Sequence, residues 1–230
     1  MEALKSVLVP IHREGHPFIM IFAVVSLGLG AMWEPLGWLG AIATCWCVYF
    51  FRDPDRIVPD KEGLVVSPGD GVVQMIEKAP PPPELDMGDE PLTRISIFLN
   101  VFNVHVNRVP IAGKITKLYY HAGKFFNASL DKASVDNERQ VAVVTTKDKK
   151  DVIFVQIAGL IARRIVCDLK ENQSVATGER FGLIRFGSRA DVYLPKGVSP
   201  SVVVGQIAVG GETVLADLKS KSAAAKGNKI

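Results

Sequence analysis

The sequence predicts a mainly β protein, a single β-rich α+β domain preceded by an N-terminal hydrophobic helical membrane anchor. Two observations lead to this prediction. Between residues 18 and 51 the chain is almost wholly apolar, with one acidic residue, Glu34, and no basic one. After residue 56 it breaks into short runs of β-branched and aromatic residues separated by Gly, Pro, Asn and Asp, which is typical of strands and turns. We therefore expect a membrane-associated segment at 1–56 and a folded domain at 57–230.

The apolar block falls into two halves, 18–33 and 36–51, which are separated by Glu34 and Pro35. Each half is shorter than the roughly 17–25 residues of a transmembrane helix. One helix through both halves would carry a carboxylate and a proline at its centre. We therefore expect two short helices that form a hairpin or a re-entrant, monotopic anchor, with a turn near 34–37. Basic residues on both flanks predict that both ends face the cytoplasm. A cleaved signal peptide is the alternative, but no A-x-A site follows the first half.

The remainder of the chain is expected to consist mainly of short strands. Each candidate is a run of about 4–8 residues bounded by turn-forming residues. The predicted strands are 71–78, 93–99, 114–120, 141–146, 152–157, 190–194, 201–204 and 213–216. Only the run at 159–169 has the spacing of a short helix, and no fixed-period repeat is present.

The composition narrows the function classes. A net charge of +3 with 22% charged residues excludes a polyanion binder, so no nucleic-acid partner is expected. A hydrophobic content of 48% excludes disorder as the main state. Three cysteines are too few for a disulfide scaffold and fit a reducing compartment that faces the cytosol. Neither C-x-x-C pairs nor an H-E-x-x-H motif is present, so we expect no metal.

His105 and Asp70 are the first candidates for acid–base chemistry. His105 lies in the stretch NVHVNRVP, where alternation would place it on one face with two asparagines that can fix its tautomer. It is a candidate general acid or base, and the alternative is a structural histidine. Asp70 lies in the turn SPGDG, where it is either ordinary turn chemistry or a carboxylate that orients a histidine.

A Gly-Ser dipeptide at Gly187 and Ser188 is the second candidate site. It joins two expected strands in the stretch GLIRFGSRADVYLP. Attack by the serine hydroxyl on the preceding carbonyl suits this position, because glycine tolerates the strained backbone that such an attack requires. The G-x-S-x-G elbow of serine hydrolases is absent.

Eight segments in order, spanning nearly the whole chain, carry a family resemblance. They are PIHREGHPFI, FFRDPDR, VSPGDGVV, FLNVFNVHVNRVP, AGKFFNASLDKASVDNER, VQIAGLIARRIV, GERFGLIRFGSRADVYLP and VVVGQIAVGGETVLA. Together they resemble the phosphatidylserine decarboxylase proenzyme family, in its short bacterial and archaeal (type A) form. The FGSR segment is the most specific of them.

The resemblance implies a pyruvoyl enzyme that is made by self-cleavage. The scissile bond would be Gly187–Ser188, giving a β chain of 1–187 and an α chain of 188–230 that remain associated. Ser188 would be the nucleophile and the source of the pyruvoyl cofactor, with neither a metal nor pyridoxal phosphate. The pyruvoyl ketone would form a Schiff base with phosphatidylserine, and loss of CO2 would give phosphatidylethanolamine.

The resemblance also assigns provisional roles to three further residues. His105 would be the general acid or base, and Asp70 its orienting carboxylate. Longer family members carry a second histidine in this stretch where the present chain has Arg108. The transfer of a family Asp-His-Ser arrangement to Asp70, His105 and Ser188 therefore stays open. Arg108 becomes a candidate for holding the substrate phosphate or carboxylate.

The same resemblance predicts where the protein is located and which partners it has. The expected location is the cell membrane, bound peripherally or monotopically, with the catalytic domain on the cytoplasmic side. The expected partners are the phospholipid substrate, the chain's own two cleavage products and a further homo-oligomer. The alternative function is a non-catalytic, membrane-tethered domain of the biotinyl/lipoyl-like adaptor type, suggested by the stretch at 202–216. Such adaptors add a helical coiled coil, and carrier domains add a modified lysine turn, and the sequence has neither.

Overall fold

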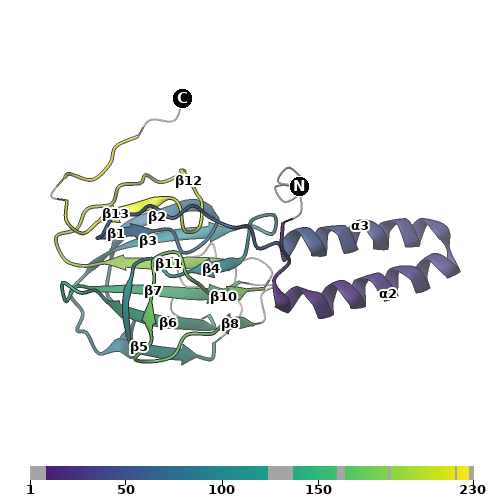
Figure 1. Ribbon diagram of the computed structural model, residues 1–230, viewed down its shortest axis with the longest axis horizontal. Coiled ribbons are helices and arrows are strands. Elements are labelled where there is room, and N and C mark those ends of the chain that lie inside the picture. The colour runs from purple at the N-terminus through teal and green to yellow at the C-terminus, as the bar shows by residue number, and fades with distance from the viewer. Residues whose placement is uncertain (1–8, 124–136, 160–163, 186–187, 221, 228–230) are drawn as a thin grey trace. The chain divides into compact units, whose positions relative to one another are not determined.

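A computed structural model of the chain describes residues 9–123, 137–159, 164–185, 188–220 and 222–227 (Figure 1). Its helical elements are η1 (Arg13–Gly15), α2 (His16–Met32), α3 (Glu34–Phe50) and η2 (Pro83–Leu85). Its strands are β1 (Leu64–Val66), β2 (Gly71–Ala79), β3 (Leu92–Leu99), β4 (Val106–Arg108), β5 (Gly113–His121), β6 (Arg139–Thr145), β7 (Asp151–Ala158), β8 (Ile165–Cys167), β9 (Ser174–Val175), β10 (Arg180–Ile184), β11 (Ser188–Leu194), β12 (Ile207–Ala208) and β13 (Val214–Asp217). The chain divides into two compact units. The hairpin unit comprises Met1–Asp55 and Phe102–Val106, and the β unit comprises Arg56–Val101 and Asn107–Ile230.

The helices α2 and α3 lie side by side as an antiparallel hairpin (Figure 1). Small residues form their contact, because a Cβ placed on Gly37 would lie 2.7 Å from the Cα of Gly30, and one on Gly40 would lie 2.5 Å from Ser26 Oγ. Ser26 Oγ and Thr44 Oγ1 also share a hydrogen bond of 3.1 Å between the helices. Close approach through small residues, with a hydroxyl pair between the helices, is typical of helix packing in membranes.

The outer faces of the hairpin are apolar and exposed. Leu27 and Ile42 have 76% and 66% of their surface accessible, and Met20 and Val24 each have 63%. Among the described residues, one helical run, Arg13–Met32, is long and apolar enough to cross a membrane. A helix buried in a soluble core would hide these side chains. The exposed apolar faces therefore favour contact with lipid.

The β unit is built on a curled eight-stranded sheet in the order β12-β2-β3-β11-β7-β6-β5-β9, with all neighbours antiparallel. Two small sheets accompany it, one with the order β4-β10-β8 and one that pairs β1 with β13. The strand β11 lies between β3 and β7 near the middle of the large sheet, and all seven of its residues are buried.

The two faces of the large sheet support different interiors. One face packs with residues of the small sheets, such as Val65 and Phe181, in the main apolar core. The other face lies under the segment that contains Leu85. On this second face Arg189 and Asp191 form a fully buried ion pair, with 2.9 Å between Arg189 Nε and a carboxylate oxygen. Ser188 and Ala190 alternate with these two residues along β11, so they face the main core, to which Ala190 belongs.

The structure confirms the predicted fold class, a mainly β protein with an N-terminal apolar helical segment. All but one of the predicted strands are present, with ends that shift by only a few residues. The expected hairpin is also present, but its turn is earlier than 34–37. Trp33 alone separates the helices, and Pro35 lies in the first turn of α3, where a proline costs no hydrogen bond.

Three local predictions were wrong. The run expected to be a helix at 159–169 is a strand over Ile165–Cys167, because it pairs with β10. Glycine at position 182 of β10 permits this pairing, since a Cβ there would collide with the Val166 carbonyl. Residues 160–163 lie outside the described residues. The run at 201–204 is not a strand. It leads into a turn that Gly205 makes possible with a φ of +90°. The alternation expected through His105 begins only at β4, because residues 101–103 form a turn.

Candidate active site

Ser188 is the first residue of β11 and is held from both sides. It pairs with Leu99 of β3 and with Ala158 of β7, and none of its surface is accessible. Its Oγ has no hydrogen-bond partner among the described residues. A buried hydroxyl without a partner costs about 1–3 kcal/mol, so such a group calls for an explanation. Gly187, the other residue of the predicted cleavage site, lies outside the described residues.

Asp70 forms an ion pair with an arginine side chain, a partner that the sequence did not suggest for it. Arg56 Nη2 lies 2.7 Å from one carboxylate oxygen of Asp70, and the backbone N–H of Gly210 donates to the other oxygen at 2.8 Å. Both charged side chains are mostly buried. Asp70 therefore joins the turn after β1 to the turn before β13. The signal that could have suggested this was the charged run FRDPDR, which ends in Arg56.

Arg108 lies in the same part of the β unit as Arg56 and Asp70. Its backbone N–H donates to the Pro68 carbonyl at 2.8 Å, and its Nη1 donates to the Gly178 carbonyl at 3.0 Å. A Cβ placed on Gly211 would lie 3.0 Å from Arg108 Cδ and 3.6 Å from the Cβ of Arg56. The structure thus brings Arg56, Asp70 and Arg108 together around the Gly210–Gly211 turn.

His105 belongs to the hairpin unit, at the end of the segment Phe102–Val106. Its ring stacks on Phe50 of α3, with 4.2 Å between the ring centroids, and its Nδ1 lies 3.0 Å from the Asn103 carbonyl oxygen. Arg52, which donates to the Phe102 carbonyl at 2.8 Å, adds a positive charge nearby. The last turn of the hairpin therefore holds this histidine.

The electrostatics of His105 favour the neutral ring. Burial is the main cause that lowers the pKa of His105 to about 4. The charge of Arg52 lowers this pKa further, and the hydrogen bond to the Asn103 carbonyl opposes the change. Because a carbonyl can only accept, Nδ1 carries the hydrogen and Nε2 carries the lone pair. At neutral pH the ring is therefore unprotonated, and Nε2 can accept a proton as a weak base. It becomes a donor only after it has taken one up.

Sequence reasoning missed two buried amides in the β unit. Gln156 of β7 donates from Nε2 to Asn107 Oδ1 at 2.8 Å. Gln156 is 2% exposed and Asn107 is fully buried. Both lie on the sheet face of Ser188, because Gln156 is paired with Ala190, two residues along β11 from Ser188. A glutamine in the middle of the apolar run VIFVQIA was the available signal.

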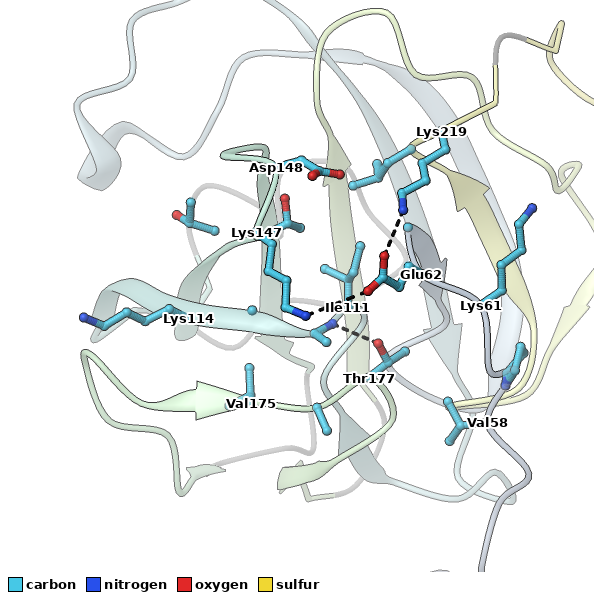
Figure 2. Close-up of a pocket in the computed structure, with 18 of the residues that line it drawn as sticks. Val58, Lys61, Glu62, Ile111, Lys114, Lys147, Asp148, Val175, Thr177 and Lys219 are labelled. Atoms are coloured by element: carbon cyan, nitrogen blue, oxygen red, sulfur yellow. Dashed lines mark hydrogen bonds and ion pairs between the residues drawn. The ribbon is translucent and has the colours of Figure 1, made fainter.

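A hollow of about 860 Å³ lies elsewhere on the β unit and contains none of these residues (Figure 2). Lys114, Lys147 and Lys219 line it, and Glu62 pairs with Lys219 at 3.0 Å and lies 3.8 Å from Lys147. The Lys219 ammonium beside it lowers the pKa of Glu62. These are solvated surface charges. Across the described part of the chain, no three His, Cys, Asp or Glu side chains are grouped closely enough to hold a metal ion.

Comparison with known proteins decides the family. The family model for phosphatidylserine decarboxylase matches residues 43–216, which is most of the chain. This chain belongs to the phosphatidylserine decarboxylase family. The resemblance stated from the eight segments is therefore confirmed, and the decarboxylase family assignment makes the protein an enzyme. It also removes the alternative of a non-catalytic adaptor domain.

Bacterial relatives match the chain over nearly its whole length. Each of the following is named phosphatidylserine decarboxylase proenzyme. The protein of Paramagnetospirillum magneticum is 61% identical over 218 residues, which cover 95% of this chain and 91% of the relative. The protein of Cereibacter sphaeroides is 59% identical over 227 residues, covering 99% and 98%. The protein of Ruegeria pomeroyi is 58% identical over 219 residues, covering 95% and 100%. The word proenzyme in these names implies a precursor that is cleaved.

Proposed function

We propose that this chain is the precursor of a pyruvoyl-dependent enzyme that converts phosphatidylserine to phosphatidylethanolamine and CO2. The observation that carries the proposal is the buried hydroxyl of Ser188, which has no hydrogen-bond partner among the residues that the structure describes. It lies in the FGSR segment of a chain that is about 60% identical to phosphatidylserine decarboxylase proenzymes. An available serine oxygen in a dry site is what self-cleavage at Gly187–Ser188 requires.

The proposed maturation uses atoms of the chain and one water. Ser188 Oγ attacks the carbonyl carbon of Gly187, so that the peptide becomes an ester and the amine of residue 188 is freed. A base removes the α-proton of residue 188, and the Cβ–Oγ bond breaks. The first chain then ends in the Gly187 carboxylate. The resulting dehydroalanine tautomerises to an imine, and water hydrolyses it to the pyruvoyl ketone and ammonia.

The surroundings of residue 188 fit a small carbonyl group. The position is inaccessible to solvent and lies inside a continuous sheet, which protects a reactive ketone from side reactions. The pyruvoyl group supplies a ketone that takes the substrate amine as a Schiff base and a conjugated carbonyl that accepts the electrons freed by CO2 loss.

We assign the proton transfers to His105. Its lowered pKa supports a neutral ring that accepts the α-proton during maturation, and the same ring, once protonated, can return a proton to the substrate carbon. Asp70 is assigned as the carboxylate that orients His105 or balances its charge; in the structure its two oxygens accept hydrogen bonds from Arg56 and from the backbone N–H of Gly210. Arg108 is assigned to bind the anionic groups of the lipid, because a guanidinium can donate two parallel hydrogen bonds to a phosphate or a carboxylate.

Replacing Arg108 by alanine is expected to weaken lipid turnover more than self-cleavage.

The exposed apolar hairpin supports a place for the enzyme on the cell membrane. A lipid substrate is then presented at high local concentration. We assign the catalytic unit to the cytoplasmic side because the segments that flank the hairpin are basic. The working form would be the complex of chains 1–187 and 188–230, with no nucleic acid and no metal, and a further homo-oligomer of that complex is part of the proposal.

The decisive experiment is the intact mass of the purified full-length protein. We expect two chains that divide between residues 187 and 188, with the shorter one resistant to Edman degradation because its N-terminus is a keto group. Ser188→Ala should remain one chain. Ser96→Ala is the matched control, since Ser96 is also fully buried with an unpartnered Oγ among the described residues, and it should be cut like the wild type. An uncut wild-type chain that decarboxylates phosphatidylserine would overturn the proposal.

A further inference from the structure

Gln156 is a polar side chain at the centre of an apolar strand, and the mechanism above gives it no role. It lies in β7 and is 2% exposed. Its Oε1 is buried and has no hydrogen-bond partner among the described residues. An unsatisfied amide oxygen at this depth destabilises the fold by about 1–3 kcal/mol. A leucine of similar size would avoid that cost.

The contacts of Gln156 fix which of its two terminal atoms carries the unpaired acceptor. The Pro68 carbonyl can only accept, so Asn107 turns its Nδ2 toward it, at 3.4 Å. Asn107 must then present its oxygen to Gln156, which donates from Nε2 at 2.8 Å. The Val166 carbonyl, 3.4 Å from the same Nε2, requires the same orientation. The Gln156 amide therefore cannot flip without losing its partners, and Oε1 is left as an acceptor.

The sheet register places Gln156 diagonally across from Ser188. In the β11–β7 pair, Ala190 is opposite Gln156 and Ser188 is opposite Ala158. Gln156 is thus the diagonal neighbour of Ser188 on the same face. Such positions are about 7–8 Å apart along the backbone, which is within reach of a long side chain. Within the described part of the chain, this face therefore holds a buried hydroxyl donor without a partner and a buried amide acceptor without a partner.

We propose that Gln156 is a positioning residue for the self-cleavage step, an inference that rests on the proposed function. The structure shows no hydrogen bond between these two atoms; during self-cleavage Gln156 Oε1 would accept the hydrogen of Ser188 Oγ, which holds the hydroxyl rotor and leaves an oxygen lone pair for the attack. An amide is too weak a base to take the proton, so Gln156 orients the nucleophile and a separate base removes the proton. Asn107 acts through Gln156 by fixing the direction of its amide.

The test is the rate of self-cleavage of the full chain, followed after cell-free synthesis in the presence of phospholipid vesicles. Gln156→Met keeps the volume and removes the acceptor. It should slow cleavage about tenfold, the rate ratio that corresponds to one net hydrogen bond. Gln156→Asn keeps the amide but shortens the side chain by one methylene, so it should also slow self-cleavage. Gln140→Met is the matched control, because Gln140 is buried and lies opposite Gln156 in β6; it should be cut at the wild-type rate.

The same substitution made in a Ser188→Cys chain distinguishes a role in positioning the hydroxyl from a general loss of structure. A thiol is a weak hydrogen-bond donor, so in a Ser188→Cys chain the effect of Gln156→Met should shrink toward none. Equal slowing in the serine and cysteine chains, or equal slowing by Gln140→Met, would overturn the role of Gln156. So would cleavage of Gln156→Met at the wild-type rate. A wild-type chain that is never cut would instead overturn the proposed function.

Discussion

His105 illustrates how a single residue takes its chemistry from its neighbours. A histidine in water has a pKa near 6.5 and is partly charged at neutral pH. Burial against Phe50 and a nearby guanidinium from Arg52 lower the pKa of His105 to about 4, although the Asn103 carbonyl opposes the change. The ring is consequently neutral at pH 7, as a group that must first accept a proton requires.

The lowered pKa predicts a pH-dependent stability. Between pH 6.5 and about pH 4 the unfolded chain binds a proton at His105 and the folded chain does not. The contribution of this site to the free energy of unfolding therefore falls as the pH is lowered through that window, and is constant above it. Denaturant unfolding at pH 7 and pH 5 should show a larger loss for the wild type than for His105→Gln. Equal losses in the two proteins would contradict the prediction.

At the scale of the element, the hairpin depends on glycines at particular positions. Gly40→Ala should push the helices apart, since its Cβ would lie 2.5 Å from Ser26 Oγ. Gly28→Ala is the matched control, because a Cβ there would meet no described residue within 4 Å, and alanine favours a helix over glycine. Hydrogen exchange in detergent micelles should be faster in α2 and α3 for Gly40→Ala, and unchanged or slower for Gly28→Ala. Equal protection in both variants would refute this view of the contact.

The strands and helices were predictable where one local pattern decided them. The strands β3, β7 and β11 are runs rich in β-branched and apolar residues with turn-forming residue types near their ends in the sequence, and the two helices are the two halves of one apolar block. The short strand β8 was missed because a three-residue run gains its structure only by pairing with β10. Tertiary pairing outweighs local preference in such segments.

The candidate site was only partly predictable for a related reason. The sequence could nominate Ser188 and Asp70 because each lies in a recognisable local motif. It could not pair Asp70 with Arg56, or place Gln156 on the face of Ser188, because both relations depend on contacts between distant parts of the chain. Strand register supplies that information, and a shift of one residue would turn Gln156 to the opposite face.

For the whole molecule, the exposed apolar hairpin predicts tight membrane binding. The full chain should float with phospholipid vesicles and stay bound in high salt, because burial of apolar surface is not screened by ions. Replacing both Leu27 and Ile42 by lysine should release it, since both side chains lie on exposed faces of the helices. The matched control replaces Ile57 and Val204, two exposed apolar residues of the β unit, by lysine. Release of the control, or retention of the hairpin variant, would count against the anchor.

The central place of β11 predicts that the two products of cleavage cannot separate in the folded state. The proposed shorter chain, 188–230, contributes β11 between β3 and β7, β12 beside β2, and β13 beside β1. Removing it would break the large sheet in two, because β11 is buried along its whole length and pairs with both β3 and β7. On gel filtration in mild detergent, both chains of the cut protein should therefore elute together, and they should separate in guanidinium because no covalent bond joins them. Elution of the shorter chain by itself without denaturant would show that the cut fragments do not share one core.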